Sequence, residues 1–154
     1  MIVEFGACHY AAAMDDSELA EELRLVMGQL VRAVRTADKM PPGAAAVLGY
    51  LDRVGPLTTA DLAQRRGVSH QSAAKTVKEL LAQGLVRAEA HPGDGRKLLL
   101  RLTPAGSRRL AEERRSRADW LGAAIDDTLS SAEREALAAA LPLLSRLAAH
   151  LNSK

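Results

Sequence analysis

Aromatic residues are scarce in this sequence, and cysteine occurs once. Aromatic side chains make up 3% of the 154 residues although hydrophobic residues make up 47%, so the core must consist of alanine, leucine and valine, which favours helices. The single cysteine, Cys8, excludes a disulfide within the chain, and a reducing cytoplasm is the expected compartment. No apolar run approaches the length of a membrane span, and the first fourteen residues lack the pattern of a signal peptide.

The residue patterns of catalysis and metal binding are also missing. No paired carboxylates, Ser-His-Asp arrangement or phosphate-binding glycine loop can be defended, so we expect neither an enzyme nor a bound cofactor. The histidines show no metal-ligand spacing; they are His9, His70, His91 and His150. Cys8 lies in the N-terminal tail without neighbouring cations that would activate it, and we interpret it as an inert thiol.

Charge is distributed unevenly along a nearly neutral chain. The formal net charge is +2, yet residues 65–115 contain twelve Lys and Arg against five Asp and Glu, an excess of seven positive charges. The compensating acidic residues collect at 15–22 and 126–135. A local basic field on a nearly neutral protein is typical of a specific DNA-binding protein rather than of a general nucleic-acid coat.

The middle third of the chain carries the pattern on which the functional prediction depends. Thr58 and Asp61 predict the start of a helix, Gly67 its end, and Ser69 the cap of a second helix over 70–83. This is the outline of a helix-turn-helix, whose second helix reads bases in the major groove. The apolar stripe of that second helix consists of Ala73, Ala74, Val77, Leu80 and Leu81.

Two runs with the alternation of strands follow, over 86–90 and 97–102. Between them His91–Arg96 is a loop of turn residues. A hairpin tip that carries an arginine suits the minor groove, whose negative potential attracts a guanidinium. We therefore expect Arg96 to enter that groove and Asp94 to brace this arginine from two residues away, with an ordinary exposed turn as the alternative.

Several short motifs lie in and after this region. They are Leu-Thr-x-x-Asp-Leu-Ala at 57–63, Gly-Val-Ser at 67–69, Leu-x-x-x-Gly-Leu-Val at 80–86, and Asp-Gly-Arg at 94–96 followed by Leu-Thr-Pro-Ala-Gly at 102–106. With them the chain resembles the MarR family of bacterial winged helix-turn-helix regulators, from about Asp16 to its end. In that family the wing arginine enters the minor groove, a role that the match gives to Arg96.

The candidate DNA-binding residues lie on the outer face of the second helix, on the helix before it and on the hairpin. They are Thr58, Arg65, Arg66, Ser69, His70, Gln71, Ser72, Lys75, Thr76, Lys78, Asp94 and Arg96. The first turn of the second helix normally meets base edges, and a glutamine such as Gln71 can bond adenine through both of its polar atoms. The alternative is a solvated face on a module that binds an acidic protein partner.

Further helices are expected on both sides of this unit. We expect one over 16–37 capped by Ser17, one over 42–55, one over 104–129 opened by Thr103, and a last helix opened by a capping box at 130–133 with a bend at Pro142. The inward residues expected in the helix over 42–55 are Ala46, Val47, Tyr50, Leu51 and Val54.

The expected fold class is mainly α with a small β-wing. A tail covers 1–15, a winged helix-turn-helix DNA-binding domain covers 41–103, and a helical dimerisation region comprises 16–40 and 104–154. The small winged unit cannot bury the apolar stripes of the terminal helices, so we expect a homodimer; their mutual burial within a monomer is the alternative. A two-fold pair reads a palindromic operator with half-sites ~34 Å apart, and the resemblance implies the same arrangement, with repression as its usual output.

The resemblance also implies a small-molecule effector, because regulators of this kind often bind one between the DNA-binding unit and the dimer helices. The candidates to line such a pocket are Met27, Tyr50 and Trp120, with plain core residues as the alternative. The family includes peroxide sensors with a reactive cysteine in the first helix, and zinc sensors. A thiol-sensing or metal-sensing variant is therefore a further alternative, although Cys8 precedes the first helix and no ligand cluster is visible.

Overall fold

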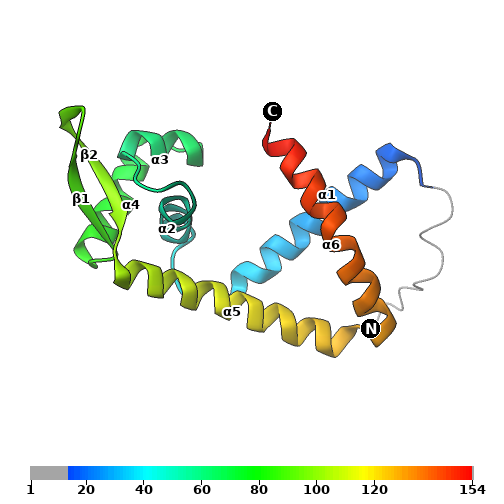
Figure 1. Cartoon of the computed structure of the whole chain (residues 1–154). Coiled ribbons are helices and arrows are strands. Elements are labelled where there is room, and N and C mark those ends of the chain that lie inside the picture. Colours follow the sequence, from blue (N-terminus) through cyan, green and yellow to red (C-terminus); the bar gives the residue numbers. More distant parts are fainter. Residues whose placement is uncertain (1–13, 154) are drawn as a thin grey trace. The chain divides into compact units, whose positions relative to one another are not determined.

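A computed structural model of the chain describes residues 14–153 (Figure 1). It divides into two units, one that reaches to Ala37 and one that begins at Asp38. The first unit contains α1 (Asp16–Val34) and a short 3₁₀ helix, η1 (Arg35–Ala37). The second contains α2 (Pro42–Val54), α3 (Thr59–Arg66), α4 (His70–Ala82), β1 (Val86–His91), β2 (Asp94–Leu102), α5 (Pro104–Thr128) and α6 (Ser131–Asn152).

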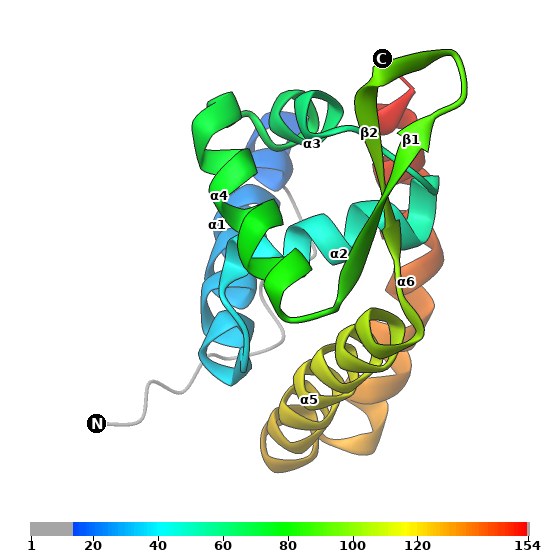
Figure 2. The same ribbon diagram turned by 90° about the vertical axis from the view of Figure 1, so that its left-hand side faces the viewer.

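The expected class, mainly α with a small β-wing, is confirmed. In Figures 1 and 2, α2, α3 and α4 group beside the antiparallel β1–β2 hairpin, and α5 begins where β2 ends. One core holds these elements together. It consists of Met40, Ala44, Ala45, Val47, Leu48, Leu51, Leu57, Leu62, Val77, Leu80, Val86, Leu100 and Leu110. No residue of α1 or α6 is buried, and no helix over residues 14–153 is long and apolar enough to cross a membrane.

The N-cap of helix α1 lies two residues earlier than the sequence suggested. Asp15, and not Ser17, is its N-cap: Asp15 Oδ1 accepts the backbone N–H groups of Ser17 at 2.8 Å and Glu18 at 2.9 Å. The Glu18 carboxylate accepts the Asp15 N–H in return at 3.2 Å. The prediction of Ser17 was wrong because an aspartate two residues earlier had its glutamate partner at the right spacing.

Two residues expected inside lie outside. Val54 is 48% exposed in α2 and Leu81 is 38% exposed in α4. In α2 the buried side chains are instead those of Ala44, Val47, Leu48 and Leu51 and their neighbour Ala45. The buried stripe is therefore rotated by about one residue relative to the predicted one, because Leu48 packs fully inside.

The hairpin is tighter at its tip than predicted. Strand pairing continues to His91 and resumes at Asp94, so Pro92 and Gly93 alone separate the strands. The expected six-residue loop was too long because His91 pairs with Asp94 across the turn, and a register shift after Ala90 places residues 95–97 between the paired Asp94 and Leu98. At the other end Leu57 pairs with Leu100, an isolated bridge that attaches the hairpin to the segment before α3.

The first turn of α5 lies directly against the chain that enters the hairpin. The Thr103 N–H donates to the Leu85 carbonyl at 3.1 Å, and the Thr103 hydroxyl donates to the Gly84 carbonyl at 2.7 Å. A Cβ atom added to Gly106 would overlap the Leu85 carbonyl oxygen. Glycine is therefore required at position 106 for close approach.

Replacing Gly106 by alanine is expected to destabilise the fold by at least about 1–3 kcal/mol, since α5 must move away from the Leu85 backbone. Gly122→Ala in the same helix meets nothing within 4 Å, and it should stabilise by about 0.5–1 kcal/mol through helix propensity. Urea unfolding of both variants measures the difference. Equal stability of the two variants would refute the close contact.

Arg134, in the first turn of α6, binds the end of α5 and so stabilises the connection between the two helices. Its guanidinium donates to the carbonyls of Leu129 and Asp126, both at 2.9 Å, and lies 2.6 Å from the Asp126 carboxylate. Ser130 and Glu133 form the predicted capping box of α6. Pro142 lies inside α6 and does not end the helix, which continues to Asn152.

Candidate nucleic-acid interface

The two helices of the predicted helix-turn-helix form as the caps indicate. The Thr58 hydroxyl accepts the Asp61 N–H at 3.2 Å, and Asp61 completes the capping box of α3. Gly67 ends that helix at φ +62°, in the left-handed region that glycine tolerates. Ser69 Oγ then accepts the Ser72 N–H at 3.2 Å and starts α4. The turn therefore places α4 at the surface with one polar face outward.

The outer face of α4 carries the predicted side chains in exposed positions. His70, Gln71, Ser72, Lys75 and Lys78 are all exposed, whereas Ala73, Val77 and Leu80 pack in the core. Thr76 is partly exposed, and its hydroxyl donates to the Ser72 carbonyl at 3.2 Å. The first turn of α4 thus presents an imidazole, an amide and a hydroxyl, which are groups that hydrogen-bond base edges.

In the hairpin, Asp94 holds Arg96 through the backbone of the turn. Asp94 Oδ1 accepts the backbone N–H of Arg96 at 3.1 Å, and Asp94 Oδ2 lies 3.7 Å from Lys97 Nζ. Asp94 therefore braces Arg96 from two residues away, as expected, and does so through the backbone of the turn. The Arg96 side chain is exposed and stands on β2, close to the tip.

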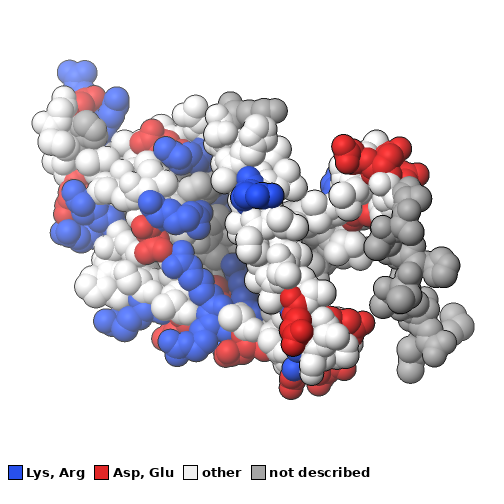
Figure 3. All heavy atoms as spheres, turned by 45° about the vertical axis from the view of Figure 1, so that its right-hand side comes forward, with Lys and Arg blue, Asp and Glu red and all other residues white. Residues whose placement is uncertain are grey.

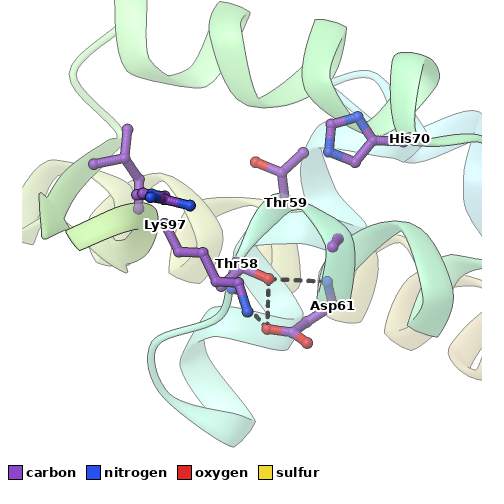
Figure 4. A pocket seen from close by; sticks show the side chains of 8 residues that line it. Thr58, Thr59, Asp61, His70 and Lys97 are labelled. Carbon is purple, nitrogen blue, oxygen red and sulfur yellow. Dashed lines mark hydrogen bonds between the residues drawn. The ribbon is translucent and has the colours of Figure 1, made fainter. Parts of the chain in front are cut away.

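A cleft of about 520 Å³ separates the hairpin from the starts of α3 and α4 (Figure 4). Lys97 enters it from β2, His70 from α4, Thr59 and Asp61 from α3, and Thr58 from the N-cap of α3. Its lining also includes Ala60, Arg96 and Leu98. Hydroxyl, imidazole and cationic groups therefore converge between the two elements expected to contact DNA.

The one carboxylate of this lining is held by the cap of α3. Asp61 Oδ2 accepts the Thr58 hydroxyl at 2.7 Å and the Thr58 N–H at 2.9 Å. These two hydrogen bonds, with smaller contributions from the charges of Arg65 and Lys97, lower the pKa of the Asp61 carboxyl below its ordinary value of 3.8. Asp61 is therefore ionised at neutral pH and serves to fix the start of α3.

Not every candidate points to the same surface. Arg66 turns back towards α2: its Nη2 lies 2.9 Å from the position of a Cβ on Gly43, and its Nη1 is buried. Arg65 is exposed, and its carbonyl accepts the Tyr50 hydroxyl at 2.9 Å. The structure thus brings Thr58, His70 and Arg96 together at the cleft, whereas Arg65 and Arg66 at the end of α3 are not part of its lining.

Sequence reasoning missed Thr59 and Lys97 as cleft residues. Lys97 follows Arg96 directly and was available as a second cation on the hairpin, but alternation of the strand predicted that neighbouring side chains point to opposite faces. The register shift near the tip changes that alternation. On the face drawn in Figure 3, lysine and arginine side chains gather over the hairpin and the helices beside it.

Comparisons with known proteins identify the family. The model described as MarR family matches residues 38–97. An uncharacterized HTH-type transcriptional regulator of Mycobacterium leprae is 31% identical over 135 residues, which cover 86% of this chain and 94% of that relative. The chain belongs to the MarR family. The predicted resemblance is confirmed, and the chain belongs to a family of transcriptional regulators rather than of enzymes.

Solved structures agree with the fold of this MarR-family chain. A Pseudomonas aeruginosa protein assigned to the transcriptional regulators has a TM-score of 0.74 and 33% identity, and the match covers 89% of this chain and 98% of that protein. A mutant of Staphylococcus aureus MepR, solved bound to an oligodeoxyribonucleotide, has a TM-score of 0.60 and 21% identity over 84% of this chain and 97% of MepR. At that identity the MepR likeness shows the fold.

The effector and sensor predictions remain predictions for this MarR-family regulator. Met27 lies exposed on α1, and Trp120 on α5 is 38% exposed. Tyr50 packs against the core, and its ring lies 5.4 Å from the Arg53 guanidinium carbon. Cys8 and His9 lie outside the described residues. Among residues 14–153 no group of three or more His, Cys, Asp or Glu side chains is arranged to hold a metal ion.

Proposed function

We propose that this MarR-family regulator binds an inverted-repeat operator as a homodimer and represses transcription by occupying it. The first turn of α4 enters the major groove and Arg96 enters the adjacent minor groove. The observation that carries the proposal is the cleft between α4 and the hairpin. A DNA strand that passes from one groove to the next crosses such a cleft, where Arg96 and Lys97 supply positive charge and Thr59 and His70 supply hydrogen bonds to phosphate.

The dimer is supported by large apolar side chains that lie exposed over residues 14–153. They are Leu19, Leu25, Val26, Met27, Leu30 and Val31 on α1, Trp120 and Leu121 on α5, and Leu137, Leu141, Leu143, Leu144, Leu147 and Leu151 on α6. Exposed apolar surface of this extent marks a protein interface. A second copy of the chain is the proposed occupant, which makes 16–40 and 104–154 the dimerisation region and 41–103 the DNA-binding domain. Because its target is chromosomal DNA, the proposed site of action is the cytoplasm.

The MepR structure supports the proposal at the level of the fold, because a protein of similar fold is bound to an oligodeoxyribonucleotide there. Repression follows from simple occupancy of a promoter, which needs no further domain. The alternative of a protein-interaction module is less well supported, because the cationic residues lie beside hydrogen-bonding groups suited to base edges.

Selection of bound duplexes from a random library tests this function. We expect the selected sites to contain two inverted half-sites with centres about one helical turn, ~34 Å, apart. A duplex with the same composition and scrambled order is the control. Selection of no sequence, together with the absence of gel retardation at low salt, would favour the acidic protein partner instead.

A further inference from the structure

A charged residue is the last buried residue of α5. The buried residues of this 25-residue helix are Gly106, Leu110 and Glu113. Glu113 is 0% exposed, and it lies in the half of α5 whose sequence is almost entirely charged. The hydrophobic core therefore anchors only the first turns of α5, and the anchorage of the following turns has to be polar.

Glu113 and Arg109 together hold a single residue of the segment before α2. Glu113 Oε1 accepts the backbone N–H of Lys39 at 2.9 Å, and Arg109 Nη2 donates to the Lys39 carbonyl at 2.9 Å. Arg109 Nη1 lies 3.3 Å from Glu113 Oε2. Because residues four apart lie on one face of a helix, this pair binds both polar groups of the Lys39 backbone.

One turn further along α5, Arg117 binds the side chain of the neighbouring residue, Asp38. Arg117 Nε donates to Asp38 Oδ1 at 2.6 Å, and Arg117 Nη2 lies 3.9 Å from Glu113 Oε1. The Asp38 side chain is 7% exposed. Its Oδ2 is buried and has no hydrogen-bond partner over residues 14–153, so Arg117 is the residue that compensates this carboxylate.

We propose that these side chains form an ionic joint that sets the direction of the α5 arm relative to the winged unit. The ionic joint consists of Asp38, Lys39, Arg109, Glu113 and Arg117. The α5 arm is the part of α5 beyond Arg117, which has no buried residue. Charge-assisted hydrogen bonds are directional, whereas an apolar contact tolerates sliding. A joint built from them therefore fixes one orientation.

This inference rests on the proposed function in one respect. In a dimer joined through the helical arms, the direction of each arm determines the distance between the two winged units. One added base pair rotates a half-site by about 36° and moves it by ~3.4 Å, since a turn of ten base pairs spans ~34 Å. The ionic joint thus makes the regulator selective for operator spacing, although none of its residues contacts a base.

Arg117→Gln, and the double variant Asp38→Asn with Arg117→Gln, test the ionic joint. The second variant removes both charges and keeps a polar side chain at each position, so it guards against misfolding caused by an unpaired buried carboxylate. Arg115→Gln is the matched control, because Arg115 is an exposed cation on the same helix. Affinities are measured for a single half-site and for operators lengthened by one and two base pairs at the centre.

We expect the parent and Arg115→Gln to prefer one spacing by at least about tenfold. In both joint variants this preference should fall to about threefold or less, while half-site affinity stays within about twofold, because the base-contacting face of α4 is untouched. A joint variant that keeps the tenfold preference would overturn the proposal. A fall of half-site affinity in both joint variants would also overturn it, since the ionic joint would then maintain the winged unit itself.

A second measurement needs no DNA and separates this inference from the proposed function. Spin labels at Gln64→Cys on α3 and Gly122→Cys on the α5 arm, in a Cys8→Ser background diluted with unlabelled protein, report the distance within one chain. We expect a narrow distribution in the parent and a broad one in both joint variants. Equal widths would refute the ionic joint, whereas broadening in a protein that binds no duplex would refute only the proposed function.

Discussion

Alanine at both Lys75 and Arg96 is expected to weaken operator binding by about 2–4 kcal/mol per dimer, because each protomer then lacks one cation on α4 and one on the hairpin. The variant should also show a shallower fall of affinity with salt, since the slope decreases by about one for each phosphate that a side chain no longer neutralises. Fluorescence anisotropy at several salt concentrations measures both effects. The structure predicts an undisturbed fold, because both side chains are exposed.

Arg32→Ala is the control for this variant. Arg32 is an exposed cation on α1, outside the winged unit, so its removal changes the net charge by the same amount per residue without touching α4 or the hairpin. The control should bind the operator like the parent. If the Lys75 and Arg96 variant binds as tightly as the parent, the proposed roles of α4 and the hairpin are wrong.

Glutamate at Leu144 and Leu147 is expected to convert the dimer into monomers. Both leucines are exposed on one face of α6, and a charge buried there in a dimer costs several kcal/mol for each side chain. The monomer binds a single half-site, so affinity for the full operator should fall by about 10³-fold, towards that of non-specific binding. Sedimentation equilibrium and anisotropy measure the two effects.

Ala149→Glu introduces one glutamate on the opposite face of α6 and serves as the control. Ala149 is exposed, as are the two leucines, so solvation alone does not distinguish them. We expect Ala149→Glu to remain dimeric and to bind the operator. A parent protein that sediments as single chains at micromolar concentration would contradict the dimer, whatever the variants do.

The parts of the fold that sequence predicted well are those decided by neighbouring residues. Thr58, Ser69 and Thr103 each cap the expected helix, and Gly67 ends α3 in the left-handed conformation. A cap needs only a side chain and an N–H group two or three residues away. The same local logic failed at α1, where Asp15 was a better cap than the residue chosen from the sequence.

The parts that sequence could not predict depend on residues far apart in the chain. Glu113 is bonded to a residue 74 positions away, and its pattern of charged neighbours at four-residue spacing is also that of any solvated helix. The cleft likewise requires α3, α4 and β2 to meet, and Lys97 lines it only because the hairpin shifts register. Neither the long-range contact of Glu113 nor the position of Lys97 in the cleft can be predicted from composition or periodicity.

The close approach of Gly106 to the Leu85 carbonyl couples the first turn of α5 to the hairpin. A helix of 25 residues spans roughly 37 Å at 1.5 Å per residue, and its first turn abuts the entry to the hairpin without a side chain between them. A displacement of the first turn of α5 is therefore passed directly to the residues that enter β1, because no soft side-chain packing lies between them. A molecule that moved this first turn would reposition the hairpin without contacting the DNA.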